Sequence, residues 1–122
     1  MKRTILCIQA FSLFLVCGCA DNAKKAFESG DSASQKGDFD TAITGYTEAI
    51  RLNPKYSEAY YKRGLAYGEK GETDKVIADL TDAIRLDPKF AQAYKWRGVA
   101  FGMKGETDKE IARVNCHNGL FQ

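Results

Sequence analysis

The sequence predicts an all-α solenoid of about three helix–turn–helix units, the last of them incomplete, on the basis of three regularities. Glycines recur in two sets at an interval of 34 residues, and the two prolines, Pro54 and Pro88, are separated by the same interval. Aligning Lys55–Asp79 on Lys89–Arg113 gives 15 identities in 25 positions, which identifies the interval as a repeat. Within each unit, apolar residues are spaced by three and four, as on one face of a helix. The two glycine sets are Gly30, Gly64 and Gly98, and Gly37, Gly71 and Gly105.

Each unit contains two helical segments with a glycine turn between them and a proline after the second. Gly71 can adopt the left-handed conformation that ends a helix, and Thr73 or Asp74 can cap the helix that follows. Helical geometry is disfavoured at the residue before a proline, so the second helix of this unit is expected to end just before Asp87. The spacing predicts helices near 22–36, 40–52, 57–70, 74–86, 91–104 and 108–114.

This pattern resembles the tetratricopeptide repeat (TPR). The family's large–x₃–Gly–x₂–aromatic signature is present as Tyr60-x₃-Gly64-x₂-Tyr67 and again, 34 residues later, from Tyr94 to Phe101. The resemblance implies close packing of two helix backbones at Gly64. It also gives the boundaries of a TPR domain over 23–122, with repeats of about 23–56, 57–90 and 91–122. The chain departs from the family in the third unit, where Glu110 replaces a small apolar residue and the pattern is lost from Val114 onward.

Composition excludes several classes of function. Lys2 and Arg3 account for the formal net charge of +2, because the rest of the chain is balanced. A neutral body lacks the basic footprint of a nucleic-acid-binding protein. A single histidine, His117, rules out a histidine-based metal cluster, and its neighbour Cys116 would not face it on a helix. We find no catalytic motif, and we expect no metal, cofactor or small-molecule substrate.

The N-terminus has the pattern of an export signal. Two basic residues precede a mostly apolar run, 5–16, which is too short to span a bilayer. The run ends in Val16-Cys17-Gly18-Cys19, which resembles a bacterial lipobox. The resemblance implies a signal peptide over 1–18, a lipidated Cys19 and a short tether over 19–22. The acyl chains, palmitate among them, would attach the protein to a membrane.

The lipobox predicts a membrane-anchored lipoprotein of the cell envelope, facing the periplasm from the outer membrane if the cell is Gram-negative. That location follows from Ala20 after the cysteine, where lipoproteins kept in the inner membrane more often have Asp. The alternative is an ordinary cleavage site that releases a soluble periplasmic or secreted protein beginning at Asp21. Cys116 is the only thiol in the body, so no disulfide framework is available to it.

Because the sequence has no catalytic or metal-binding motif, the remaining candidate for a functional site is a binding surface. In the TPR family, the first helix of each unit lines a concave groove. Carried over by position, the resemblance assigns to this groove a set of partner-binding residues from all three units: Phe27, Asp31, Glu58, Tyr61, Leu65, Lys95, Trp96 and Val99. An alternative reading of Tyr61 and Trp96 is that they only cover neighbouring apolar surface.

The groove carries both signs of charge together with aromatic side chains, so we expect it to bind a mixed segment of another protein. The Lys and Asn pairs that clamp a peptide's terminal carboxylate in related adaptors are absent, because Tyr61 and Leu65 occupy those positions in the second unit. The sequence therefore predicts an assembly or scaffolding factor at the cell envelope. Three alternatives remain open: a truncated or frameshifted remnant of a larger TPR protein, a purely structural role in the envelope, and, more remotely, an enzyme.

Overall fold

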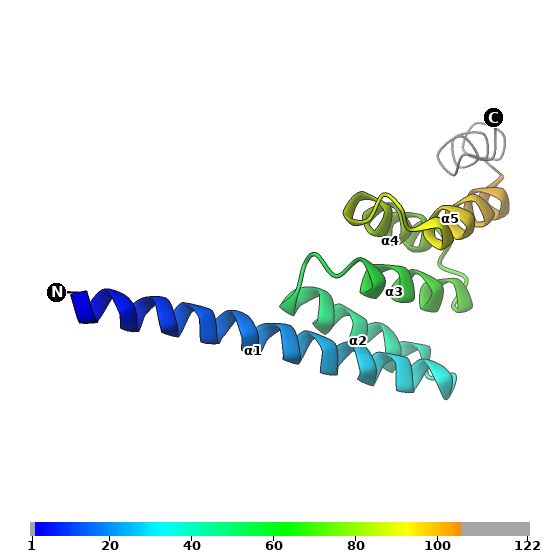
Figure 1. Ribbon diagram of the computed structural model, residues 1–122. Coiled ribbons are helices and arrows are strands. Elements are labelled where there is room, and N and C mark those ends of the chain that lie inside the picture. Colours follow the sequence, from blue (N-terminus) through cyan, green and yellow to red (C-terminus); the bar gives the residue numbers. More distant parts are fainter. Residues whose placement is uncertain (1, 106–122) are drawn as a thin grey trace.

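The computed structural model describes residues 2–105, with side chains described from Gly18 onward. Within this range the chain forms five α-helices and no strand: α1 (Lys2–Gln35), α2 (Phe39–Leu52), α3 (Ser57–Glu69), α4 (Thr73–Leu86) and α5 (Ala91–Lys104). Consecutive helices pack against one another, and Figure 1 shows α2 to α5 stacked along one direction beside the C-terminal half of α1. The predicted all-α solenoid of helix–turn–helix units is confirmed over these residues. The predicted helix over 108–114 lies outside the described residues.

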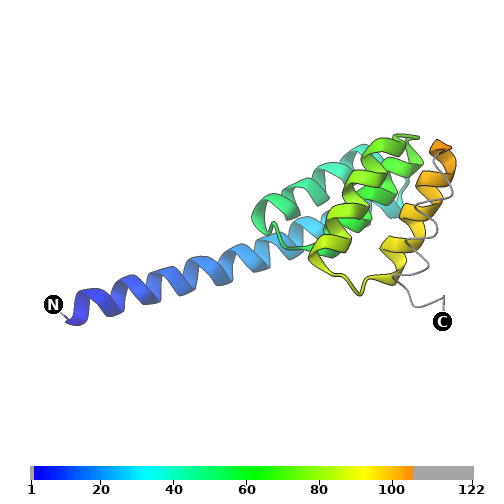
Figure 2. The same ribbon diagram turned by 90° about the horizontal axis from the view of Figure 1, so that it is seen from above.

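The first helix is longer than the sequence pattern predicts. The expected helix begins near residue 22, whereas α1 begins at Lys2 and continues without a break to Gln35. Residues 2–35 contain no proline, so nothing in the local sequence forces the helix to stop. Figure 2 shows the N-terminal part of α1 extending well beyond the other helices. No helix in the described part of the chain is long and apolar enough to cross a membrane.

The turns follow the sequence closely. Gly71 has a φ of 76°, and the amide of Glu72 donates to the carbonyl of Tyr67 at 3.0 Å, which closes the end of α3. Asp87, before the second proline, is extended, with a φ of −132°, and its carboxylate accepts from the amide of Lys89 at 3.1 Å. These contacts explain why α3 and α4 end where they do.

Capping differs from the prediction in one detail. Helix α4 begins at Thr73, one residue before the expected start, so Thr73 and Asp74 lie in its first turn and Glu72 is the N-cap. In the first unit the cap is Asp38, whose carboxylate accepts from the amide of Thr41 at 3.1 Å. Hydrogen bonding from the Thr41 side chain, and to a lesser extent from its amide, lowers the pKa of Asp38.

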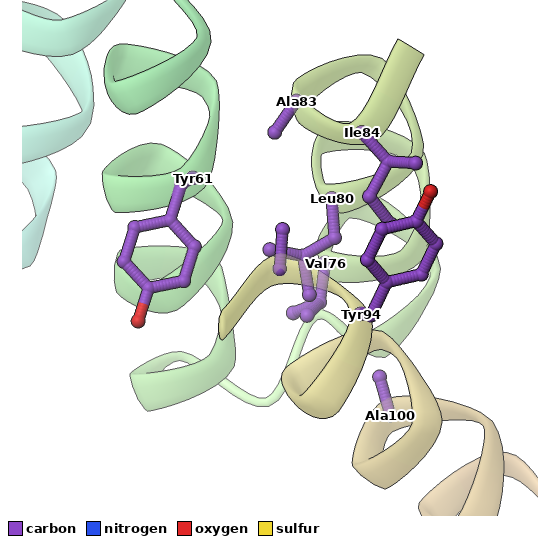
Figure 3. Packing of buried hydrophobic residues seen from close by; sticks show 8 residues of the cluster. Tyr61, Val76, Leu80, Ala83, Ile84, Tyr94 and Ala100 are labelled. Atoms are coloured by element: carbon purple, nitrogen blue, oxygen red, sulfur yellow. The ribbon is translucent and has the colours of Figure 1, made fainter. Parts of the chain in front are cut away.

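Buried side chains form two clusters that share α3. The first cluster fills the space between α1, α2 and α3, and its centre is the fully buried Tyr46. The second cluster lies between α3, α4 and α5 around the fully buried Leu80 (Figure 3). Its labelled members are Tyr61 from α3, Val76, Leu80, Ala83 and Ile84 from α4, and Tyr94 and Ala100 from α5. Because α3 contributes to both clusters, the units have no independent cores.

Glycines allow the two helices of a unit to approach closely. A Cβ at Gly64 would lie 3.3 Å from Cβ of Asp79 on α4, as expected for a helix contact. In the first unit the approach is closer still, because a Cβ at Gly45 would lie 2.8 Å from Cα of Gly30. Helices α1 and α2 therefore meet backbone to backbone at this point.

Candidate functional site

The groove predicted from the sequence corresponds to a face shared by α3 and α5, on which the structure has two adjoining hollows. We call the first the charged hollow. It has a volume of about 540 Å³ and is lined by Ser57, Glu58, Tyr61, Lys62, Leu65, Asp87, Phe90 and Gln92. We call the second the apolar hollow. It has a volume of about 260 Å³ and is lined by Gly64, Leu65, Gly68, Glu69, Thr73, Val76, Trp96, Val99, Ala100 and Met103. The two hollows meet at Leu65, so they form one continuous surface.

Five of the eight predicted groove residues line these hollows. Glu58, Tyr61 and Leu65 lie on successive turns of α3 and line the charged hollow. Trp96 and Val99 line the apolar hollow from α5. Trp96 and Val99 are 42% and 44% exposed, which is unusual for apolar side chains of this size. Lys95 is exposed on the same helix but lines neither hollow.

Tyr61 has both a structural role and a position at the groove. Its side chain is only 8% exposed and its ring centroid lies 4.8 Å from that of Phe90. Burial raises the pKa of the Tyr61 hydroxyl. The ring therefore forms part of the floor of the charged hollow, and little of its area is free to contact a partner.

The two predicted groove residues on α1 lie apart from the hollows. Phe27 is 7% exposed, and its ring lies 4.9 Å from that of Tyr56 and 5.6 Å from that of Tyr46. It is a core side chain, because the small residues of α1 bring that helix close to α2 and enclose the ring. Phe27 therefore offers almost no surface to a partner.

Asp31 connects three helices. Its carboxylate accepts a hydrogen bond from the Tyr46 hydroxyl of α2 at 2.7 Å and forms an ion pair with Lys62 of α3 at 3.4 Å. Burial raises the pKa of Tyr46, and the adjacent Asp31 carboxylate raises it further. Asp31 thus has partners within the fold, and it neutralises the one cation that lines the charged hollow.

Sequence reasoning missed Met103, which is the most exposed of the large apolar side chains described, at 71%. The signal was present, because Trp96, Val99 and Met103 are spaced by three and four and so share one face of α5. Sequence reasoning also missed Asp87 and Phe90. They follow α4 in the loop between units, and the helix-face pattern does not extend to that loop.

Cys19 lies on α1 and is exposed, far in sequence from both hollows. Among the side chains that the structure describes, 18–105, no group of three or more His, Cys, Asp or Glu is arranged to hold a metal ion. What the described part of the chain offers is therefore a surface with apolar and acidic parts.

Comparisons with known proteins identify the family. A model described as "TPR repeat" matches residues 30–71, and one described as "Tetratricopeptide repeat" matches residues 57–90. Together they span residues 30–90, half of the chain. The protein belongs to the tetratricopeptide repeat family. A search of curated proteins found no match.

Solved structures agree with this assignment. The Arabidopsis OM64 TPR domain is 29% identical with a TM-score of 0.76, and the match covers 82% of each chain. The MamA protein is 31% identical with a TM-score of 0.75, over 91% of this chain and 60% of that one. The TPR2B domain of yeast Sti1, solved in a complex with pHsp70, is 29% identical with a TM-score of 0.69, over 79% and 74% of the two chains.

Proposed function

We propose that this protein is a protein–protein interaction module, an assembly or scaffolding factor that binds a segment of a partner on the face formed by α3 and α5. The observation that carries the proposal is the exposure of Trp96, Val99 and Met103 beside a hollow. Exposed apolar side chains gathered on one face are typical of interaction sites, because leaving them in water is unfavourable. The yeast Sti1 domain, a relative of the same fold, was solved in a complex with pHsp70.

We further propose that the module is tethered at the bacterial cell envelope through lipid on Cys19. The support for this part is the lipobox-like sequence ending at Cys19, together with the exposure of that cysteine. The expected location is the periplasmic side of a membrane, the outer membrane in a Gram-negative cell. A soluble periplasmic or secreted protein is the alternative location.

Site-specific photo-crosslinking in cells tests the interaction. A photoreactive amino acid at Val99, on the apolar hollow, is expected to capture a distinct partner protein. The matched control places the same amino acid at Ala78, which is exposed on α4 and lines neither hollow. Identical products from both positions, or none from Val99, would contradict the proposal.

One observation favours the alternative that the chain is a remnant of a larger TPR protein. In the second unit Arg63 pairs with Asp79, whereas the repeat puts Arg113, a like charge, in register with that aspartate. Within the described residues, the buried Nε of Arg97 has no hydrogen-bond partner. Reading the nucleotide sequence downstream of Gln122 distinguishes the two proposals, because repeats continuing in another frame would identify a remnant.

A further inference from the structure

The two hollows differ in charge. The charged hollow is lined by two carboxylates, Glu58 and Asp87, and by one cation, Lys62. Asp31 lies 3.4 Å from Nζ of Lys62 and neutralises it. The carboxylates of Glu58 and Asp87 therefore give this hollow an excess of negative charge. A ligand that places a cation there would be attracted, and one that places a carboxylate there would be repelled.

No cation lines the apolar hollow. Its single charged lining residue is Glu69, at the end of α3, and the other side chains that line it are apolar apart from Thr73. Trp96, Val99 and Met103 surround it from α5. A volume of about 260 Å³ is sufficient for one large apolar side chain. Lys95 is exposed on α5 and lines neither hollow.

The distance between the hollows determines how far apart the two side chains of a ligand that enter them must lie. Gln92 lines the charged hollow and Val99 lines the apolar hollow, seven residues along the same helix. At 1.5 Å per residue the separation along α5 is about 10 Å. A peptide in the extended polyproline II conformation has about three residues per turn and rises about 3.1 Å per residue, so side chains three positions apart lie on one side of it and about 9 Å apart.

We propose that the groove selects an extended partner segment in which a lysine or arginine lies three positions from a large apolar residue such as leucine or methionine. The basic side chain occupies the charged hollow beside Glu58 and Asp87, and the apolar side chain occupies the hollow beside Trp96, Val99 and Met103. This inference rests on the proposed function and adds the chemistry of the partner. It also predicts that acidic peptides are rejected.

Fluorescence anisotropy with defined peptides tests this selectivity on the full chain purified in detergent. The probes are labelled peptides of Ser and Gly that contain a Lys and a Leu three positions apart, made in both orders. The controls replace Lys by Glu, or Leu by Ser. One order of the Lys/Leu peptide is expected to bind about tenfold more tightly than either control, and added salt should weaken its binding.

Charge reversal at the groove provides the matched variant. Glu58→Lys should shift the preference from the Lys/Leu peptide toward the Glu/Leu peptide. Asp82→Lys, a reversal on α4 at a residue that lines neither hollow, should leave the preference unchanged. Circular dichroism confirms that both variants remain helical. Met103→Ser should weaken the Lys/Leu peptide and leave the Lys/Ser peptide unaffected.

Three results would overturn the inference: equal or tighter binding of the Glu/Leu peptide, no binding of any peptide, or self-association in sedimentation that displaces the peptide and so identifies a second copy as the occupant. If either of the first two results is obtained but Val99 still crosslinks to another protein, the proposed interaction module stands and only the ligand chemistry is rejected. If the peptides do not bind selectively and Val99 also crosslinks to no other protein, the proposed function itself is rejected.

Discussion

Arg63 and Asp79 form a two-pronged ion pair across the second unit: Nε and Nη2 of the arginine each donate to one carboxylate oxygen at 2.8 Å. The side chain of Asp79 is 7% exposed and that of Arg63 is 17% exposed. The pair raises the pKa of Arg63. Arg63 also donates to the hydroxyl of Thr47 on α2 at 3.1 Å, so one side chain connects three helices.

Removing one member of this pair is expected to destabilise the fold strongly. Asp79→Ala leaves the guanidinium largely buried without its partner, and we expect a loss of about 3 kcal/mol in the free energy of unfolding. Arg63→Leu combined with Asp79→Ala should lie within about 1 kcal/mol of the wild type, because no charge is then left unpaired. Urea denaturation measures both.

The control for this prediction is an exposed ion pair. Arg85→Ala removes the contact with Asp82 at 3.3 Å, and its cost should stay below about 1 kcal/mol. If the double substitution costs as much as Asp79→Ala alone, the loss does not arise from an unpaired charge.

Close backbone approach predicts different outcomes for two glycine substitutions. Gly45→Ala places a methyl group 2.8 Å from the backbone of Gly30 and should cost about 1–3 kcal/mol. Gly68→Ala meets only Cγ2 of Val76, at 3.7 Å, and should gain about 0.5 kcal/mol from the better helix former. Thermal unfolding compares them, and a shift of the same sign for both would contradict the packing described for α1 and α2.

The surroundings of Glu72 predict that the stability of the fold depends on pH. A hydrogen bond from Lys75 lowers the pKa of Glu72 below its ordinary value of 4.5, and Lys70 lowers it further. A carboxyl whose pKa is lower in the folded state stabilises the fold above that ordinary value, and this contribution is lost as the pH falls through the folded pKa.

Side-chain NMR titration should therefore give a midpoint for Glu72 below 4.5, and Lys75→Ala should move it upward. A midpoint that the substitution leaves in place would show that the ion pair does not form in solution.

The lipobox-like sequence that ends at Cys19 predicts that the protein associates with membranes. Cys19→Ala is expected to abolish fractionation with membranes, because the apolar run before it is too short to anchor the chain. Labelling with an alkyne fatty acid should mark the wild type and leave the variant unmarked. Wild type and variant that are both soluble and unlabelled, with Asp21 at the N-terminus, would support the soluble alternative.

The repeat pattern predicted most of the fold because its signals are local. Gly71 and Asp87 specify turns through their own backbone preferences, and the observed helices end within one or two residues of the expected positions. The start of α1 was missed because no proline or glycine turn precedes it, and the expected start was set by the spacing of the repeat.

The site was less predictable because it depends on distances between units. Family position placed Tyr61 and Trp96 on the face that carries the two hollows, yet it also placed Phe27 there. Only the close approach of α1 to α2 shows that the Phe27 ring is enclosed. The pairing of Asp31 with Lys62, which decides the charge of the groove, joins residues 31 positions apart and has no sequence signature.

The continuity of α1 changes what an anchor at Cys19 would mean. The four residues of the expected tether, 19–22, lie inside the helix, and Ala23 is the first buried residue among the side chains that the structure describes. Four helical residues advance the chain by about 6 Å. A lipid on Cys19 would therefore hold the solenoid close to the bilayer, because a short helical segment and no flexible linker would separate the lipid from the core. Attachment of this kind would restrict the partners of the solenoid to those whose binding segment runs close to the lipid surface.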